Sequence, residues 1–170
     1  MTSHIDTVVG LDHVPEPMRS LHALDRVDYV DDSTLHTSAA RSWSPEEWAR
    51  AALEGGRSVR RWSFVPWRLL LGLRLGPSYT PGYVHGWRVI GRGDDWIRAE
   101  ASSWLMTCNA VALVDEGAVS VALFVRYDHP VAPLWWGRML SGVHRRLMPG
   151  LLHEGERVLV SSGVPAGADR

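Results

Sequence analysis

The stretch LMTCNAVALVDEGAVSVALFVRY, residues 105–127, decides the fold class of this chain. Two runs rich in apolar and β-branched residues, 105–114 and 118–127, flank the turn sequence Asp115-Glu116-Gly117, which is the pattern of a β-hairpin. In the second run, alternate residues from Val119 to Tyr127 are apolar or aromatic and share one face, as in a strand. The stretch therefore predicts two antiparallel strands.

Other segments before this hairpin also have the period of strands. Residues 86–91 and 96–101 flank the turn sequence RGDD at 92–95, which predicts another hairpin. Further upstream, the segment 26–37 alternates around Val27 and Tyr29 and predicts a first strand. The chain is thus expected to form one early strand and, later, a run of antiparallel strands.

Helix signals fill the interval between the early strand and the others. Ser44 suits an N-cap and the acidic residues after Pro45 suit a first helical turn, so a helix is predicted from residue 45 to the stop at Gly55-Gly56. Pro66 opens a second short helix, predicted over 67–75 and closed by Gly76-Pro77.

A long amphipathic helix is predicted at the C-terminal end, over residues 133–152. Its apolar residues recur at spacings of four, three, four and four, which places them on one stripe of a helix. Pro149 is expected to kink or loosen the end of this helix. The stripe consists of Trp136, Leu140, Val143, Leu147 and Leu151.

Length and composition are those of one globular domain. The chain has 170 residues, of which 45% are hydrophobic and 22% charged. We assign a single domain to residues 20–154 and expect loosely ordered termini at 1–19 and 155–170. The formal net charge is −1, so no overall field attracts nucleic acid, and no nucleic-acid partner is predicted.

Several kinds of chemistry are excluded or disfavoured by the residues present. The chain has no lysine, which rules out Schiff-base catalysis, and its lone Cys108 cannot form an internal disulfide. Neither a phosphate-binding glycine motif nor an HExxH motif occurs, and no two histidines are four residues apart. We therefore predict no cofactor and no metal site. With no signal peptide or apolar run long enough to span a bilayer, a cytoplasmic location is expected.

The order of the predicted elements resembles the helix-grip fold of the START-like superfamily, which includes polyketide cyclases and lipid-transfer proteins. The likeness covers about residues 20–153. It implies an α+β protein in which a curved antiparallel sheet wraps around the long C-terminal helix, with two short helices after the first strand and a cavity inside. The patterns that resemble a bacterial branch of this superfamily are RVDYVDDSTL (26–35), FVPWRLLLGLRLG (64–76), VSVALFVRYDHP (119–130) and MLSGVHRRLMPGLL (139–152).

Candidate site residues are those whose side chains could reach such a cavity. His144 could serve as a general acid or base, Tyr127 as a proton donor and Asn109 as a donor to an oxyanion. Each has an ordinary alternative: His144 as a surface residue beside Arg145, Tyr127 as a core aromatic and Asn109 as an exposed amide. Nine tryptophans suit either a packed core or cavity walls, and the expected walls are Trp62, Trp67, Trp104, Met106 and Trp136.

Three functions remain open at this point. The first is a cavity protein for a hydrophobic, polyketide- or lipid-like molecule, acting as a cofactor-free cyclase or isomerase. The second is a carrier or sensor that uses the same cavity without catalysis. The third is an interaction module with a filled core, in which the arginine- and tryptophan-rich stretch Arg57 to Gly76 contacts a membrane surface or a protein.

Overall fold

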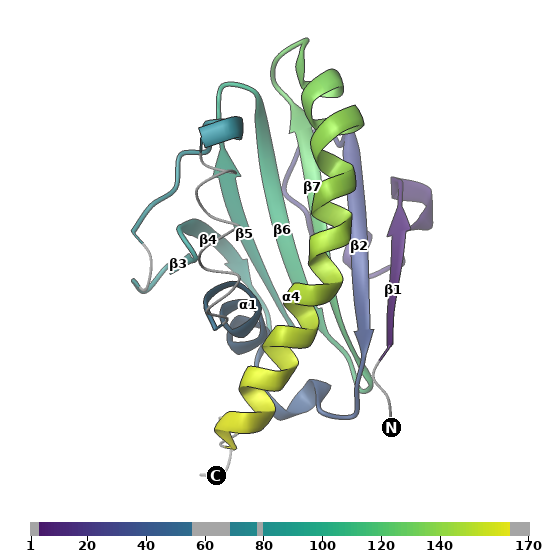
Figure 1. Ribbon diagram of the computed structural model, residues 1–170, viewed down its shortest axis with the longest axis vertical. Coiled ribbons are helices and arrows are strands. Elements are labelled where there is room, and N and C mark those ends of the chain that lie inside the picture. The colour runs from purple at the N-terminus through teal and green to yellow at the C-terminus, as the bar shows by residue number, and fades with distance from the viewer. Residues whose placement is uncertain (1–3, 56–68, 78–79, 164–170) are drawn as a thin grey trace.

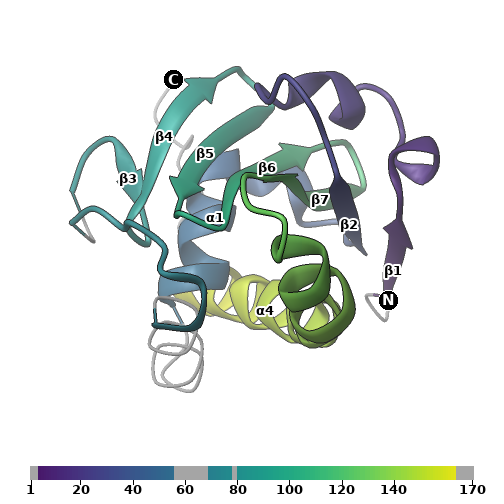
Figure 2. The same ribbon diagram turned by 90° about the horizontal axis from the view of Figure 1, so that it is seen from above.

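A computed structural model describes residues 4–55, 69–77 and 80–163. In this part of the chain, seven strands form one antiparallel sheet in the order β1-β2-β7-β6-β5-β4-β3, and a long C-terminal helix lies across one face of it (Figures 1 and 2). This helix-grip-like α+β arrangement agrees with the predicted fold class. The strands are β1 (His4–Val9), β2 (Tyr29–His36), β3 (Tyr83–Val84), β4 (Trp87–Arg92), β5 (Trp96–Ser102), β6 (Met106–Val114) and β7 (Ala118–Tyr127).

The predicted hairpin at 105–127 is confirmed as the β6–β7 pair at the centre of the sheet. Its register runs from Met106 opposite Tyr127 to Val114 opposite Val119, and the Asp115 backbone N–H donates to the Ala118 carbonyl at 2.8 Å. The early strand β2 pairs with β7 on the far side from β6. The first predicted strand therefore joins the centre of the sheet.

Helix α1 (Pro45–Glu54) follows the short helical turn η3 (Ala40–Ser42) and begins where the sequence predicts. The Ser44 side chain accepts from the Glu47 backbone N–H, and the Glu47 carboxylate accepts from the Ser44 backbone N–H at 2.7 Å, which forms a complete capping box. Trp48, Ala51 and Ala52 are buried, so the helix packs by one face.

The C-terminal helix is longer than predicted. It begins with a π-helical segment, η4 (Pro133–Leu140), and continues as α4 (Ser141–Ser162), with Gly163 in the left-handed region at its end. The expectation of loose chain from residue 155 is wrong for residues 155–162, because Leu159 is buried against the cluster around Trp48. Pro149 lies inside α4 without ending it.

The N-terminal residues also differ from the prediction. Residues 4–9 were expected to be loose, whereas they form edge strand β1. The turns η1 (Leu11–His13) and η2 (Met18–Leu21) then cross the sheet face away from α4, where Val14, Met18 and Leu24 are buried. These apolar residues are irregularly spaced, so no period in the sequence reveals them.

The second predicted helix, 67–75, lies partly outside the described residues. Residues 69–71 are helical, but Gly72 has a φ of 61°, in the left-handed region that favours glycine. Beyond it the chain is extended, and the Arg74 backbone N–H donates to the Ser102 carbonyl at 2.8 Å. The predicted helix therefore does not continue past Leu71. None of the helices in the described part of the chain is long and apolar enough to cross a membrane.

Candidate functional site

A cavity of about 620 Å³ lies between the sheet and the C-terminal helix. Its walls are almost wholly apolar and come from α1, residues 70–75, the central strands and the C-terminal helix. The floor contains three alanines on the sheet face that α4 covers, Ala99 of β5 and Ala110 and Ala112 of β6. Small side chains in the middle of the sheet leave space that larger ones would fill, and this creates the cavity.

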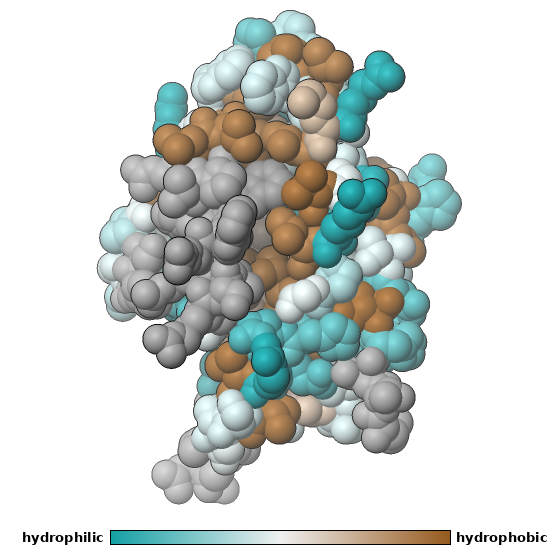
Figure 3. Space-filling model, in the orientation of Figure 1, coloured by the Kyte–Doolittle hydropathy of each residue, from teal (hydrophilic) through white to brown (hydrophobic). Residues whose placement is uncertain are grey.

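The cavity approaches the surface beside the middle of the helix. Val143 and Leu147 line it, yet within the described part of the chain their residues remain 45% and 43% exposed. Leu70, on the opposite wall, is also exposed. Apolar side chains gather on this face of the molecule in Figure 3. Cavity walls that are also exposed apolar surface are typical of the mouth of a pocket for a hydrophobic ligand.

His144 lines this cavity and is held by a buried carboxylate. Its Nδ1 lies 3.0 Å from Oδ2 of Asp31, which is buried in the middle of β2. The Tyr29 hydroxyl donates to the same Oδ2 at 2.6 Å. Nη1 of Arg145 in turn donates to the Tyr29 hydroxyl oxygen at 3.0 Å. Asp31 therefore bonds both His144 at the cavity wall and Tyr29, and Arg145 extends the network through the Tyr29 hydroxyl.

The folded backbone brings these groups together from two elements. In β2, Tyr29 and Asp31 share one face with Leu35, which packs with the Trp48 cluster beneath α4. The Trp136 indole packs between the two elements, with its centroid 5.7 Å from the Tyr29 ring and 5.6 Å from the His144 ring. Burial among these rings strengthens the hydrogen bonds of the network.

Burial and charge set the protonation of the groups around the cavity. Burial, and next to it the Asp31 carboxylate, raise the pKa of the Tyr29 hydroxyl well above its usual value, so Tyr29 remains a donor. Burial raises the pKa of the Cys108 thiol, so this cavity-lining cysteine is not a ready nucleophile. Burial lowers the pKa of His85, the other histidine at the cavity wall.

The structure brings two of the predicted site residues to the cavity, His144 and Trp136. Met106 is fully buried in the core cluster next to it, but it is not part of the wall. Tyr127 is half-buried, with its hydroxyl close to Gly137. Trp104 is 58% exposed and stands edge-on to His129. Trp62 and Trp67 lie outside the described residues, as does most of Arg57 to Gly76.

Asn109 is buried, but on the other face of the sheet. Its Oδ1 accepts from the Ala23 backbone N–H at 2.8 Å, and its Nδ2 donates to the Glu100 carboxylate at 3.3 Å. Its neighbours Cys108 and Ala110 point to the cavity, so alternation sends Asn109 away from it. Asn109 fastens the N-terminal segment to the sheet and does not face a ligand in the cavity.

Sequence reasoning missed Asp31 as a site residue. The signal was present, because two consecutive aspartates, Asp31 and Asp32, stand inside a predicted strand, where acidic residues are unusual. Arg145 entered only as a neighbour of His144, and its contact with Tyr29 could not be foreseen across 116 residues. A third group was missed as well: His4, Asp6 and His36, whose side chains lie within metal-ligand distance of one another.

Comparison of the chain with protein-family models, with curated proteins and with solved structures finds no match in any of the three. The fold and the site by themselves define the class: this is a helix-grip-like α+β protein with an apolar cavity and a buried aspartate–histidine pair at the cavity wall.

Proposed function

We propose that this chain binds a hydrophobic, polyketide- or lipid-like molecule in the cavity and acts on it as a cofactor-free cyclase or isomerase. The observation that carries the proposal is His144, which lines an apolar cavity while Asp31 holds its Nδ1. The likeness of the sequence to the START-like superfamily points the same way, since cavity binding of such molecules is common to that superfamily.

The cavity itself would supply much of the catalysis. A flexible ligand rarely places its reacting atoms close together in solution. A cavity that binds it with these atoms about 3–3.5 Å apart makes that reactive conformation the bound one. The apolar walls also exclude water, so a carbanion or enolate formed inside is not quenched by solvent. A cyclisation needs only this confinement and one group that moves a proton.

His144 is the group we assign to proton transfer. Its Nε2 would take a proton from a carbon next to a ligand carbonyl, and Asp31 would stabilise the resulting imidazolium through Nδ1–H. The carbanion attacks a second carbonyl of the same chain to close a ring, and the new alkoxide takes the proton back from Nε2. In an isomerisation the proton returns to a different atom. Either sequence balances without a redox cofactor.

Tyr29 and Arg145 are positioning residues in this scheme. The Tyr29 hydroxyl and the His144 ring bond the same oxygen of Asp31, which fixes the carboxylate between them. Arg145 donates to the Tyr29 hydroxyl oxygen and supplies a positive charge near Asp31. The carboxylate is thereby kept available to orient His144.

Ligand binding is tested first, by native mass spectrometry of the protein as purified and by extraction of whatever it holds. Ala110→Phe places a ring in the cavity and should abolish uptake of a hydrophobic ligand or dye, since Ala110 lines its floor. Val160→Phe adds the same ring at an exposed site outside the cavity and should leave uptake unchanged. Uptake by Ala110→Phe equal to that of the unmodified protein would contradict binding in this cavity.

Catalysis is tested with the precursor class that the extracted ligand indicates. His144→Asn should lower turnover about 100-fold or more while ligand binding persists. His153→Asn, on the exposed side of the same helix, is the matched control and should retain full turnover. A chain that binds its ligand but turns over no precursor would be a carrier or sensor. A chain that takes up no hydrophobic molecule would favour the interaction module.

A further inference from the structure

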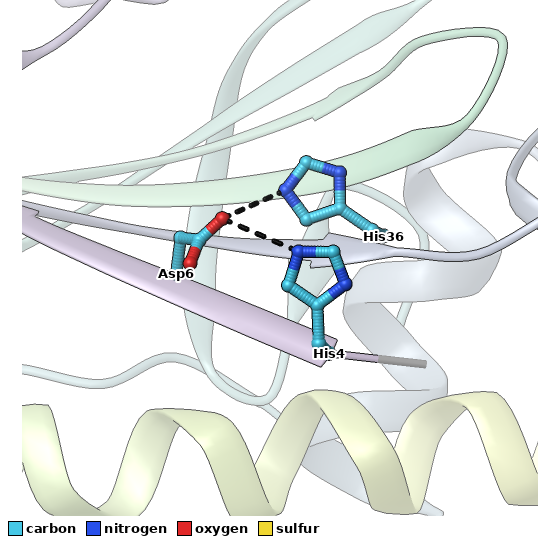
Figure 4. A group of neighbouring side chains, drawn as sticks. All are labelled: His4, Asp6 and His36. Atoms are coloured by element: carbon cyan, nitrogen blue, oxygen red, sulfur yellow. Dashed lines mark hydrogen bonds and ion pairs between the residues drawn. The ribbon is translucent and has the colours of Figure 1, made fainter. Parts of the chain in front are cut away.

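The edge of the sheet farthest from β3 carries a cluster of two histidines and a carboxylate. His4 of β1 stands directly opposite His36 of β2, and Asp6 lies two residues along β1 on the same face as His4. Nε2 of His4 is 3.5 Å from Oδ2 of Asp6, and Nε2 of His36 is 3.1 Å from the same oxygen. Figure 4 shows both imidazoles turned toward this one carboxylate oxygen.

We propose that His4, Asp6 and His36 bind a divalent transition-metal ion of the zinc class. Zinc forms bonds of about 2.0–2.2 Å to histidine nitrogen and carboxylate oxygen, so neighbouring ligand atoms in a tetrahedral site are ~3.3 Å apart. The two nitrogen–oxygen separations, 3.5 and 3.1 Å, bracket that value. All three ligand atoms lie within 4.8 Å of one another, so small side-chain rotations can bring them onto one face of a tetrahedron, and the fourth position opens to solvent.

The ring orientations require one adjustment. The His4 and His36 rings are stacked, with centroids 4.3 Å apart and planes 10° from parallel, whereas a bound ion must lie close to the plane of each ring. Rotation of the rings about χ2 meets this need. The His4 and His36 side chains are 66% and 41% exposed, so the surroundings leave room for it. The backbone, which sets the spacing of the three residues, does not have to move.

The donor set determines which ions the cluster selects. Two imidazoles and one carboxylate suit Zn²⁺, Ni²⁺ and Cu²⁺, whereas Mg²⁺ and Ca²⁺ prefer sites made of oxygen ligands. Nothing in this selection depends on the cavity.

The site lies on the opposite face of the sheet from the cavity. Ile5, between His4 and Asp6, packs into the cluster beneath α4, so its two neighbours point the other way. A bound ion would tie the first described strand to β2 across a separation of 32 residues, from His4 to His36. Its expected effect is to hold β1 on the sheet and to stabilise the fold by mass action.

The test is calorimetric titration of the untagged full chain with ZnCl₂. We expect one ion per chain, with no heat of binding from MgCl₂. Asp6→Asn, which keeps the shape of the side chain, and His36→Ala should each remove the zinc signal. His153→Ala is the matched control: His153 also lies near a carboxylate, 3.9 Å from Glu156, but among the described residues it belongs to no group of three possible ligands. That variant should bind zinc as the unmodified chain does.

Hydrogen exchange supplies a second readout that does not depend on a variant folding. With Zn²⁺ present, the amides of residues 4–9 should exchange more slowly, and residues 141–162 should be unchanged. His4→Ala alters only the first described residue, so it serves as a folded variant if circular dichroism shows His36→Ala to be disturbed. The proposal is overturned if the unmodified chain takes up no zinc, or if Asp6→Asn and His4→Ala bind it undiminished.

Discussion

The two halves of the C-terminal helix meet the same sheet in different ways. From Trp136 to Leu152 the helix forms one wall of the cavity, and Val143 and Leu147 remain nearly half exposed. From Gly155 to Ser162 it packs against α1 and β2, and at Gly155 an added Cβ would lie 3.0 Å from the Ala52 backbone nitrogen. One continuous helix is thus loosely supported at one end and tightly packed at the other.

This difference separates the two tasks of the helix. Close packing near α1 supplies stability, because every buried methylene there has partner atoms. The half over the cavity gives up that packing. Strand β2 beside it also buries two acidic residues, Asp31 on the face toward the helix and Asp32 on the opposite face. We infer that the tightly packed end of the helix supplies the stability that keeps the loosely packed end folded over the cavity.

The largest expected effect comes from one substitution made in each half. Leu159→Ala should lower the free energy of unfolding by about 2–5 kcal/mol, since Leu159 is buried in the cluster with Trp48 and Leu35. Leu147→Ala should cost about 1 kcal/mol or less, because its side chain is already partly in water. Urea unfolding of both variants provides the measurement. Equal losses would mean that the two halves are packed alike.

The next prediction concerns the loss of stability caused by burying the Asp32 carboxyl group. Burial, and after it the neighbouring Asp31, raise the pKa of Asp32 from 3.8 to about 6. The folded protein therefore holds this proton more tightly than the unfolded chain, and the stabilisation from it is full below about pH 4 and lost as the pH rises through about 6. An asparagine at this position has no proton to lose in this range. Above pH 6 the free energy of unfolding of Asp32→Asn should therefore exceed that of the unmodified protein by up to about 3 kcal/mol.

The measurement is urea unfolding of both proteins at a series of pH values from 4 to 7. Histidines and other carboxyl groups also titrate in this range. Such groups contribute equally to both proteins, so the difference between the two curves isolates Asp32. If the free energies of unfolding of the two proteins changed in parallel from pH 4 to 7, burial of the Asp32 carboxyl group would not destabilise the fold.

The smallest effect tests the close approach of α1 and α4. Gly155→Val should lower the free energy of unfolding by about 1–3 kcal/mol, because the added side chain meets the backbone of Ala52. Gly150→Val adds the same group to the same helix at a position with nothing within 4 Å, and the change should stay within about 0.5 kcal/mol. If thermal unfolding gives the two variants the same stability, the contact at Gly155 is not a tight one.

Local patterns predicted much of the fold. The hairpin at 105–127, the strand at 26–37 and the helix after Ser44 form within a few residues of their predicted bounds. Alternation, turn residues and a capping box act between close neighbours in the chain, so a sequence shows them directly. The sequence did not predict strand β1, because an edge strand needs little apolar patterning. Four of its six residues are exposed.

The site was predictable only in part. The sequence indicated His144 and Trp136, which lie on the apolar side of an evident helix, and the structure places both at the cavity. It also indicated Asn109, which faces away. A period of two shows which residues of a strand share a face, but it does not show which face the helix covers. The covering of both faces, by α4 and by the N-terminal segment, decides that.

The sequence by itself determined the α+β class, the run of antiparallel strands and the long C-terminal helix, because these depend on interactions between neighbours in the chain. The tertiary structure alone decided that Asp31 would meet His144 across 113 residues and that His4 would stand opposite His36. It also decided where the cavity lies, since three alanines make a cavity floor only when a helix spans the space above them. Contacts of this kind depend on strand order and packing, which no local pattern records.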